Sequence, residues 1–218
     1  MNQWPLIWEQ LKLLIYTAPA TLLAIAAHEF AHGLVSYWLG DPTPKRDGRL
    51  SLNPLRHLDL LGTVCMLIFH FGWAKPVLVN PQYYKKPKQG MALTALAGPG
   101  MNLILAFLSA GIFVGIFYLT EGTAEGFLDY LMVLFQYMAV LNIGLGVFNL
   151  IPIPPLDGSK ILGAILPQRL YFQLMKYERY GGILMIILLY TGVLSGPLGI
   201  LRDGLLEWMI GAWAGIFG

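Results

Sequence analysis

The sequence predicts an all-α protein that crosses a membrane several times. Of its 218 residues, 56% are apolar and 12% are charged, roughly half the charged fraction of a soluble domain. Three stretches contain no Asp, Glu, Lys or Arg: residues 89–120, 130–156 and 180–201. Each is longer than the ~18 apolar residues that indicate a membrane-spanning helix. This composition excludes a disordered chain, a secreted disulfide scaffold and a soluble protein that binds nucleic acid.

The charge-free stretches give the approximate positions of the helices. Spanning helices are predicted at 20–39, 91–119 and 130–151, and further C-terminal helices after residue 181. Pro19 is expected to break or kink the helical pattern. Residues 3–16 mix Trp and charged residues with Leu and Ile, so they either lie at the membrane surface or begin the first span.

The basic residues set the expected orientation. The loops at 41–57, 75–90 and 160–179 hold twelve of the fourteen Lys and Arg residues, whereas the acidic connection at 120–129 holds none. Because basic loops are retained in the cytoplasm, the three basic loops are expected on the cytoplasmic side and the acidic connection outside. The sequence therefore predicts a multi-pass protein of the cell membrane.

The stretch 58–79 is predicted to be re-entrant. Both of its flanks are basic, so it should enter and leave on the same side, and its apolar part is short for a complete crossing. A short, tilted crossing is the alternative. Non-helical backbone at such a depth must be buried in protein or line a watery cavity. Short β-strands around residues 72–79 would let an extended substrate add a further strand, and simple packing is the other interpretation of that stretch.

The chemistry is predicted by His28-Glu29-Phe30-Ala31-His32, which matches the pattern H-E-x-x-H. On a helix, positions i and i+4 share a face, so both imidazoles can reach one metal ion. Glu29 lies close enough to deprotonate water on that ion, and zinc suits a site whose three protein ligands leave one position open. A chance match on a surface helix is the alternative. Three ionisable groups in one apolar span are costly, however, unless they share a partner.

Asp157 is the candidate third ligand. Three prolines lie among the five residues before it, and they hold the chain extended so that a carboxylate can be presented inward. Gly158 allows a tight turn into the next segment. A cap at the start of the helix that follows is the alternative role for this residue. We predict one Zn²⁺ ion held by His28, His32 and Asp157.

Three motifs together resemble the site-2 protease family of intramembrane zinc metalloproteases. They are HEFAH in the first span, AGPGMN at 97–102 and FNLIPIPPLDG at 148–158. The segments GDPTPKRDGRLSLNP and GWAKPV are similar to those of its compact prokaryotic members. Many members of the family carry a PDZ domain, and none is expected here. The resemblance covers most of the chain and is weakest before residue 18 and after residue 166.

The resemblance implies a single membrane-embedded metalloprotease domain over residues 1–218. Its three-helix core would comprise residues of about 18–39, 91–119 and 128–151, flanked by the re-entrant segment at 58–79 and by C-terminal helices. Small residues at Gly98 and Gly100 would then let the core helices approach closely.

The resemblance also implies roles for individual residues. His28, His32 and Asp157 would be the zinc ligands and Glu29 the catalytic base. Asn149 would lie beside the zinc, where its amide could polarise the scissile carbonyl or hold an extended substrate; an interhelical hydrogen bond is the alternative. Asn102 and Asn142 are expected to be structural, and His57 and His70 are expected to be structural or interfacial.

The predicted function is hydrolysis of a peptide bond in or near a transmembrane helix of a membrane-protein substrate. The resemblance implies cleavage near the cytoplasmic face, often in regulated signalling. A regulatory membrane partner or a homo-oligomer is therefore also expected. Two alternatives belong to other classes. One is a metal or ion transporter, since polar residues in spans also mark ion paths. The other is a non-catalytic membrane partner that keeps zinc as a structural staple.

Overall fold

The computed structural model describes residues 4–59, 62, 75–167, 169–170, 176 and 178–218. Most of these residues are helical, and none of them lies in a β-strand, which confirms the predicted all-α class for this part of the chain. The elements are α1 (Trp4–Trp38), α2 (Thr43–Arg46), η1 (Pro54–Arg56), η2 (Pro81–Tyr83), α4 (Pro87–Leu119), α5 (Phe127–Asn149), α6 (Asp157–Ile165), α8 (Glu178–Tyr190) and α9 (Ser195–Phe217).

Three of these helices are long and apolar enough to cross a membrane. They are Lys12–Trp38 of α1, Pro87–Leu119 of α4 and Phe127–Asn149 of α5, and they overlap the spans predicted at 20–39, 91–119 and 130–151. The helices α8 and α9 form a bent pair with an angle of 79° between them, and this pair would add a fourth span if it is counted as one. The chain is therefore a multi-pass membrane protein.

The first helix begins earlier than the sequence predicts. The helix α1 runs without interruption from Trp4 to Trp38 with Pro19 inside it, so the expected start near residue 18 is wrong. Proline removes one backbone hydrogen bond, but neighbouring helices can satisfy the freed carbonyl group of a membrane helix. Residues 4–16 are thus continuous with the first span.

Most of the predicted re-entrant stretch 58–79 lies outside the described residues, so its path stays a prediction. Its described end, residues 75–79, contains neither helix nor strand. The Lys75 N–H donates to the His57 carbonyl at 2.8 Å, which ties this end to the loop after α2. The predicted short β-strands are not seen in the described part of this stretch.

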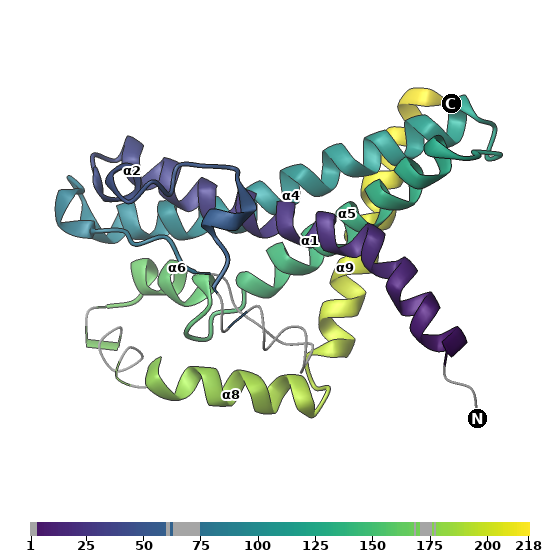
Figure 1. The fold of residues 1–218 in the computed structure, drawn as a ribbon. Helices are drawn as coiled ribbons and strands as arrows, with labels where there is room; N and C mark the ends of the chain where they lie inside the picture. Colours follow the sequence, from purple (N-terminus) through teal and green to yellow (C-terminus); the bar gives the residue numbers. More distant parts are fainter. Residues whose placement is uncertain (1–3, 60–61, 63–74, 168, 171–175, 177) are drawn as a thin grey trace.

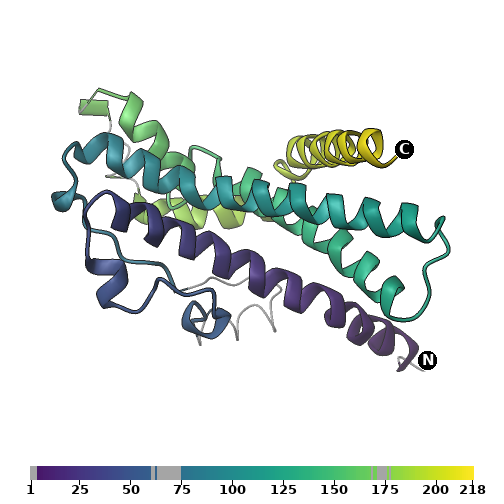
Figure 2. The same ribbon diagram turned by 90° about the horizontal axis from the view of Figure 1, so that it is seen from above.

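The helix α4 is central to the fold. It packs against α1, α5, α6 and α9, and Figure 2 shows α1, α4 and α5 running side by side. The buried core between α4, α5 and α9 consists of Ala106, Ala110, Ala139, Ile143 and Met209, so three of its five residues are alanines. Small residues let backbones approach closely, and the resulting van der Waals packing holds helices together in a membrane.

The basic loops share one end of the bundle. Figure 1 shows α2, the start of α4 and α6 at this end, whereas the connection between α4 and α5 lies at the opposite end. The described parts of the loops at 41–57, 75–90 and 160–179 are therefore on the same side of the helices, as the charge pattern requires.

A buried carboxylate ties these loops to α1. Asp41 is fully buried, and it accepts hydrogen bonds from the Ser36 hydroxyl at 2.9 Å and from the backbone N–H groups of Thr43 at 2.9 Å and Asn80 at 2.7 Å. Burial alone raises the pKa of the Asp41 carboxyl, but these hydrogen bonds outweigh it, so the pKa lies below its ordinary value. Asp41 thereby holds the end of α1 against the segment that leads into α4.

Candidate metal centre

Two histidines on one face of α1 point toward α4. His28 and His32 are one turn apart and both are buried. Their rings lie edge to face with centroids 4.6 Å apart, and their Nε2 atoms are separated by 3.0 Å. The helix therefore places the two imidazoles as the i, i+4 spacing predicts.

Asp157 reaches the same point from α6. It is the first residue of that helix, and its Oδ2 atom lies 3.1 Å from Nε2 of His28 and 3.0 Å from Nε2 of His32. The Asp157 side chain is buried and forms no capping hydrogen bond at the start of α6, so the alternative role as a helix cap is not observed. The three donor atoms form a group that could hold a metal ion.

The turn into α6 requires glycine after Asp157. A Cβ atom on Gly158 would collide with the backbone carbonyl groups of Leu150 and Ile151. Without that atom, the start of α6 can lie directly against the end of α5. This contact helps to bring the carboxylate to His32, although 125 positions separate the two residues in the chain.

Acceptors on α4 hold the other edge of each imidazole. Nδ1 of His28 lies 2.5 Å from the side-chain oxygen of Asn102, and Nδ1 of His32 lies 2.6 Å from the backbone oxygen of Thr94. Because a carbonyl oxygen only accepts, we assign the proton of each ring to Nδ1, which donates. Each Nε2 atom then keeps its lone pair for a metal ion at the donor group.

Asn102 is the residue whose role the sequence analysis missed. Its Nδ2 donates to Oδ1 of Asn142 at 2.8 Å and to the Ala24 carbonyl at 3.2 Å, which leaves Oδ1 free for His28. Both amides are fully buried and join α1, α4 and α5 behind the donor group. Asn142 is structural, as predicted, but Asn102 also orients an imidazole. An amide in a charge-free span needs a polar partner. The position of Asn102 in such a span is therefore the feature of the sequence that indicates a buried polar contact.

Gly98 leaves room for both imidazoles. A Cβ atom at this position would lie 2.6 Å from Cε1 of His32 and 2.7 Å from Cε1 of His28, whereas the same atom on Gly100 would meet nothing within 4 Å. The predicted role of small residues in close packing is therefore right for Gly98, which contacts the two histidines, and wrong for Gly100.

The donor group suits zinc. Two imidazole nitrogens and one carboxylate oxygen are ligands that catalytic zinc accepts, and they leave one position open. Their separations are 3.0, 3.0 and 3.1 Å. Ligands of a tetrahedral zinc ion with bonds of about 2.0 Å are roughly 3.3 Å apart, so shifts of a few tenths of an ångström are sufficient.

A cavity of about 170 Å³ opens beside the donor atoms. Glu29 lines this cavity together with Asn149 and Lys160, and the segment around Val77 forms part of its wall. Oε2 of Glu29 accepts a hydrogen bond from the Val77 N–H at 2.9 Å. The structure thus places a carboxylate that is not in the donor group beside that group, in the same cavity.

The remaining candidates do not belong to the donor group. Asn149 lines the cavity, but its Nδ2 donates to the Leu145 carbonyl of its own helix at 3.0 Å, and no interhelical hydrogen bond of Asn149 is seen among the described residues. His57 is buried with Nε2 at 2.7 Å from the Ser51 carbonyl oxygen, in keeping with the structural one of its two predicted roles. His70 lies outside the described residues.

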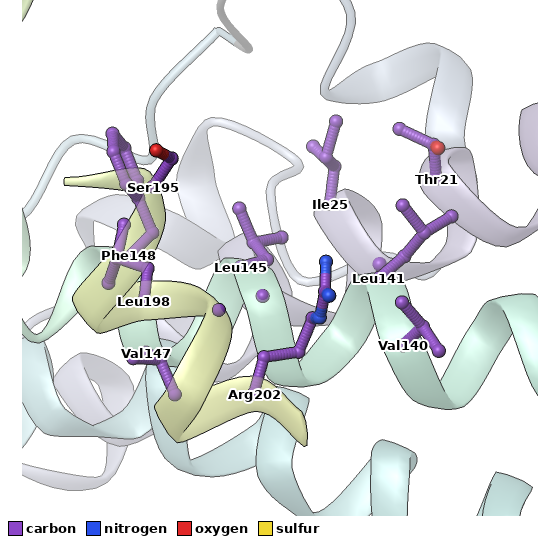
Figure 3. Close-up of a pocket in the computed structure, with 13 residues that line it drawn as sticks. Thr21, Ile25, Val140, Leu141, Leu145, Val147, Phe148, Ser195, Leu198 and Arg202 are labelled. Atoms are coloured by element: carbon purple, nitrogen blue, oxygen red, sulfur yellow. The ribbon is translucent and has the colours of Figure 1, made fainter. Parts of the chain in front are cut away.

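A larger cavity lies elsewhere in the bundle. It has a volume of about 540 Å³, and Figure 3 shows that mostly apolar side chains of α1, α5 and α9 line it. The charged residue in its lining is Arg202, which pairs with the adjacent Asp203 at 2.8 Å. The donor residues line the smaller cavity, so we place the chemistry there.

Comparisons with known proteins show to which family the chain belongs. The model for peptidase family M50 matches residues 127–191. Two similar proteins carry names that begin "Putative zinc metalloprotease". One is YwhC of Bacillus subtilis, which is 37% identical over 193 residues that cover 88% of this chain and 86% of that protein. The other is Rip2 of Mycolicibacterium smegmatis, which is 28% identical over 182 residues that cover 80% of this chain and 66% of that protein. No solved structure matches the chain.

The chain has several apolar helices, and they surround a buried donor group that suits zinc. It is also similar to proteins named as zinc metalloproteases. Together these observations define a multi-pass membrane metalloprotease. The chain belongs to peptidase family M50, the site-2 protease family. The resemblance seen in its motifs is therefore confirmed, and Zn²⁺ is its cofactor.

Gly98→Ala is expected to abolish zinc binding, because the added methyl group would overlap the imidazoles of His28 and His32. The measurement is the zinc content of the purified, detergent-solubilised protein, with circular dichroism to verify that the helices are intact. Gly100→Ala on the same helix is the matched control and should keep the wild-type zinc content. Equal zinc in the two variants would contradict the placement of α4 against the histidines.

Proposed function

We propose that this metalloprotease hydrolyses a peptide bond in or near a transmembrane helix of a membrane-protein substrate, as a step in regulated intramembrane proteolysis. One observation carries the proposal. The donor group of His28, His32 and Asp157 lines one cavity with Glu29, and all of these residues except Asp157 belong to the first candidate span. A cavity built on an apolar helix favours a substrate that is itself in the membrane.

In this proposal His28, His32 and Asp157 hold the zinc ion, and residues 1–218 form one membrane-embedded domain. Bound zinc supplies Lewis acidity, which polarises a carbonyl group and lowers the pKa of water to about 7. Asn102 and Thr94 keep the two imidazoles oriented for this task through their contacts with the Nδ1 atoms.

Glu29 is the proposed general base, as in metalloproteases of the H-E-x-x-H type. Its carboxylate lines the cavity beside the donor atoms, and the hydrogen bond from Val77 holds one of its oxygens. Glu29 would take a proton from the attacking water and deliver it to the leaving amine. Asn149 lines the same cavity, and its amide would hold the extended substrate or polarise its carbonyl group.

The depth of the site bears on how a substrate is cut. His32 precedes Trp38, the last residue of α1, by six positions, which places it ~9 Å along the helix axis from that end. A substrate helix buries its peptide groups in its own hydrogen bonds, so it must unwind locally before cleavage, and helix-breaking residues should help. A regulatory membrane partner or a second copy of the chain would control this step.

The active site is proposed to face the cytoplasm, because the end of the bundle near the site carries the basic loops. Single cysteines in a Cys65→Ser background test this orientation. We expect Glu125→Cys to react with a membrane-impermeant maleimide on intact cells, and Lys85→Cys to react only after the membrane is opened. The reverse pattern would place the site on the outer side.

Glu29→Gln is expected to lower the rate of cleavage by roughly 10²-fold or more while zinc remains bound. Glutamine keeps an oxygen to accept from Val77, but it cannot take a proton from water. Candidate single-pass substrates reconstituted with the purified protein provide the cleavage assay, and metal analysis of the same samples gives the zinc content.

Glu125→Gln is the matched control, because Glu125 lies in the exposed connection at the far end of the bundle. It should cleave at the wild-type rate. Cleavage retained by Glu29→Gln would refute the role of this residue as the base. Wild-type protein that holds zinc but cleaves no substrate would favour the non-catalytic, zinc-stapled partner instead.

A further inference from the structure

Lys160 lies one turn after Asp157 on α6 and contacts its carboxylate. The Nζ atom of Lys160 donates to Oδ1 of Asp157 at 3.2 Å. The other carboxylate oxygen, Oδ2, faces the imidazoles of His28 and His32. The two oxygens of Asp157 therefore have separate partners, with the donor group on one side and an ammonium group on the other.

The ammonium group is also open to the cavity. The side chain of Lys160 is 40% exposed, whereas that of Asp157 is 8% exposed, and Lys160 lines the same cavity as Glu29. A lysine ammonium has three N–H donors. The contact with Asp157 uses one of them, so two remain for a group that enters the cavity.

The charges around the cavity favour a role for this cation in the reaction. The charged side chains that line it are Glu29, Asp157 and Lys160. A divalent ion would be balanced by the two carboxylates, so the loaded site would be neutral without Lys160 and would carry one positive charge with it. Negative charge develops on the carbonyl oxygen as water attacks a peptide bond, and a preorganised positive group lowers the energy of that transition state.

We propose that Lys160 is a further catalytic residue, which donates a hydrogen bond to the oxygen of the scissile carbonyl as negative charge develops there. This inference rests on the proposed proteolytic function of the cavity. A purely structural salt bridge to Asp157 makes a different prediction, because its loss would disturb the ligand and hence the binding of zinc.

Lys160→Met tests the inference with a side chain of similar length and no charge. We expect kcat to fall by about 10²- to 10³-fold, the loss seen when one donor to such an oxygen is removed, while KM and zinc content stay at wild-type values. Lys160→Arg retains the positive charge and should recover most of the rate. The assay uses the fluorogenic transmembrane peptide that the wild-type protein cleaves fastest from a synthetic panel.

Lys88→Met is the matched control. Lys88 also contacts α6, through a hydrogen bond from its Nζ to the carbonyl group of Leu166 at 2.7 Å, but it does not line the cavity. This variant should cleave the peptide at the wild-type rate.

Three results would overturn the inference: an unchanged kcat in Lys160→Met, a loss of zinc from that variant, or a raised KM with kcat unaltered. Loss of zinc would make Lys160 a support for the ligand, and a raised KM would make it a ground-state binding residue. If the wild-type protein binds zinc but cleaves no peptide in the panel, the proposed function fails, and the inference fails with it. These outcomes are distinguishable because zinc content and rate are measured on the same samples.

Discussion

The imidazoles of His28 and His32 and the carboxylate of Asp157 are in contact inside an apolar helix bundle. Much of the surrounding structure holds these three groups in place. A charged side chain within a membrane costs at least ~2.5 kcal/mol by insertion scales unless it has a partner, and a buried polar group without a hydrogen bond is also unfavourable. Each ring nitrogen of His28 and His32 has a polar neighbour, and each oxygen of Asp157 has one as well. In the proposed metal centre, zinc would complete this arrangement, because it would give all three donors a common positive partner.

The helix α4 supplies most of the support for the donor group, although none of the three donor residues lies on it. Thr94, Gly98 and Asn102 follow one another at intervals of four residues, so they lie on one face of the helix. Thr94 accepts from one histidine, Asn102 accepts from the other, and Gly98 leaves the space that both rings occupy. These three contacts require α4 to lie close against α1, although α4 carries no charged residue from position 89 onward.

The members of the donor group could be predicted from the sequence because their geometry is local or their chemistry is conspicuous, and their role as zinc ligands stays a proposal. The spacing of His28 and His32 puts both on one face of any helix, and Asp157 stands out as the acidic residue after a charge-free stretch. The sequence indicates that Asn102 needs a polar partner. That this partner is His28 could not be predicted, because it depends on how α4 is rotated about its axis relative to α1, and packing across the whole bundle sets that rotation. Pro19 illustrates the same limit, since a local rule predicts a break or a kink at this residue, and α1 continues through it as one helix.

Zinc X-ray absorption spectroscopy of the purified wild-type protein and of Asp157→Ala tests the metal centre most directly. The wild-type spectrum should show imidazole scattering and a first shell of nitrogen and oxygen at about 2.0–2.1 Å, and the substitution should remove zinc or change that shell. Sulfur ligands at about 2.3 Å, or a spectrum that Asp157→Ala leaves unchanged, would contradict a zinc ion held by His28, His32 and Asp157.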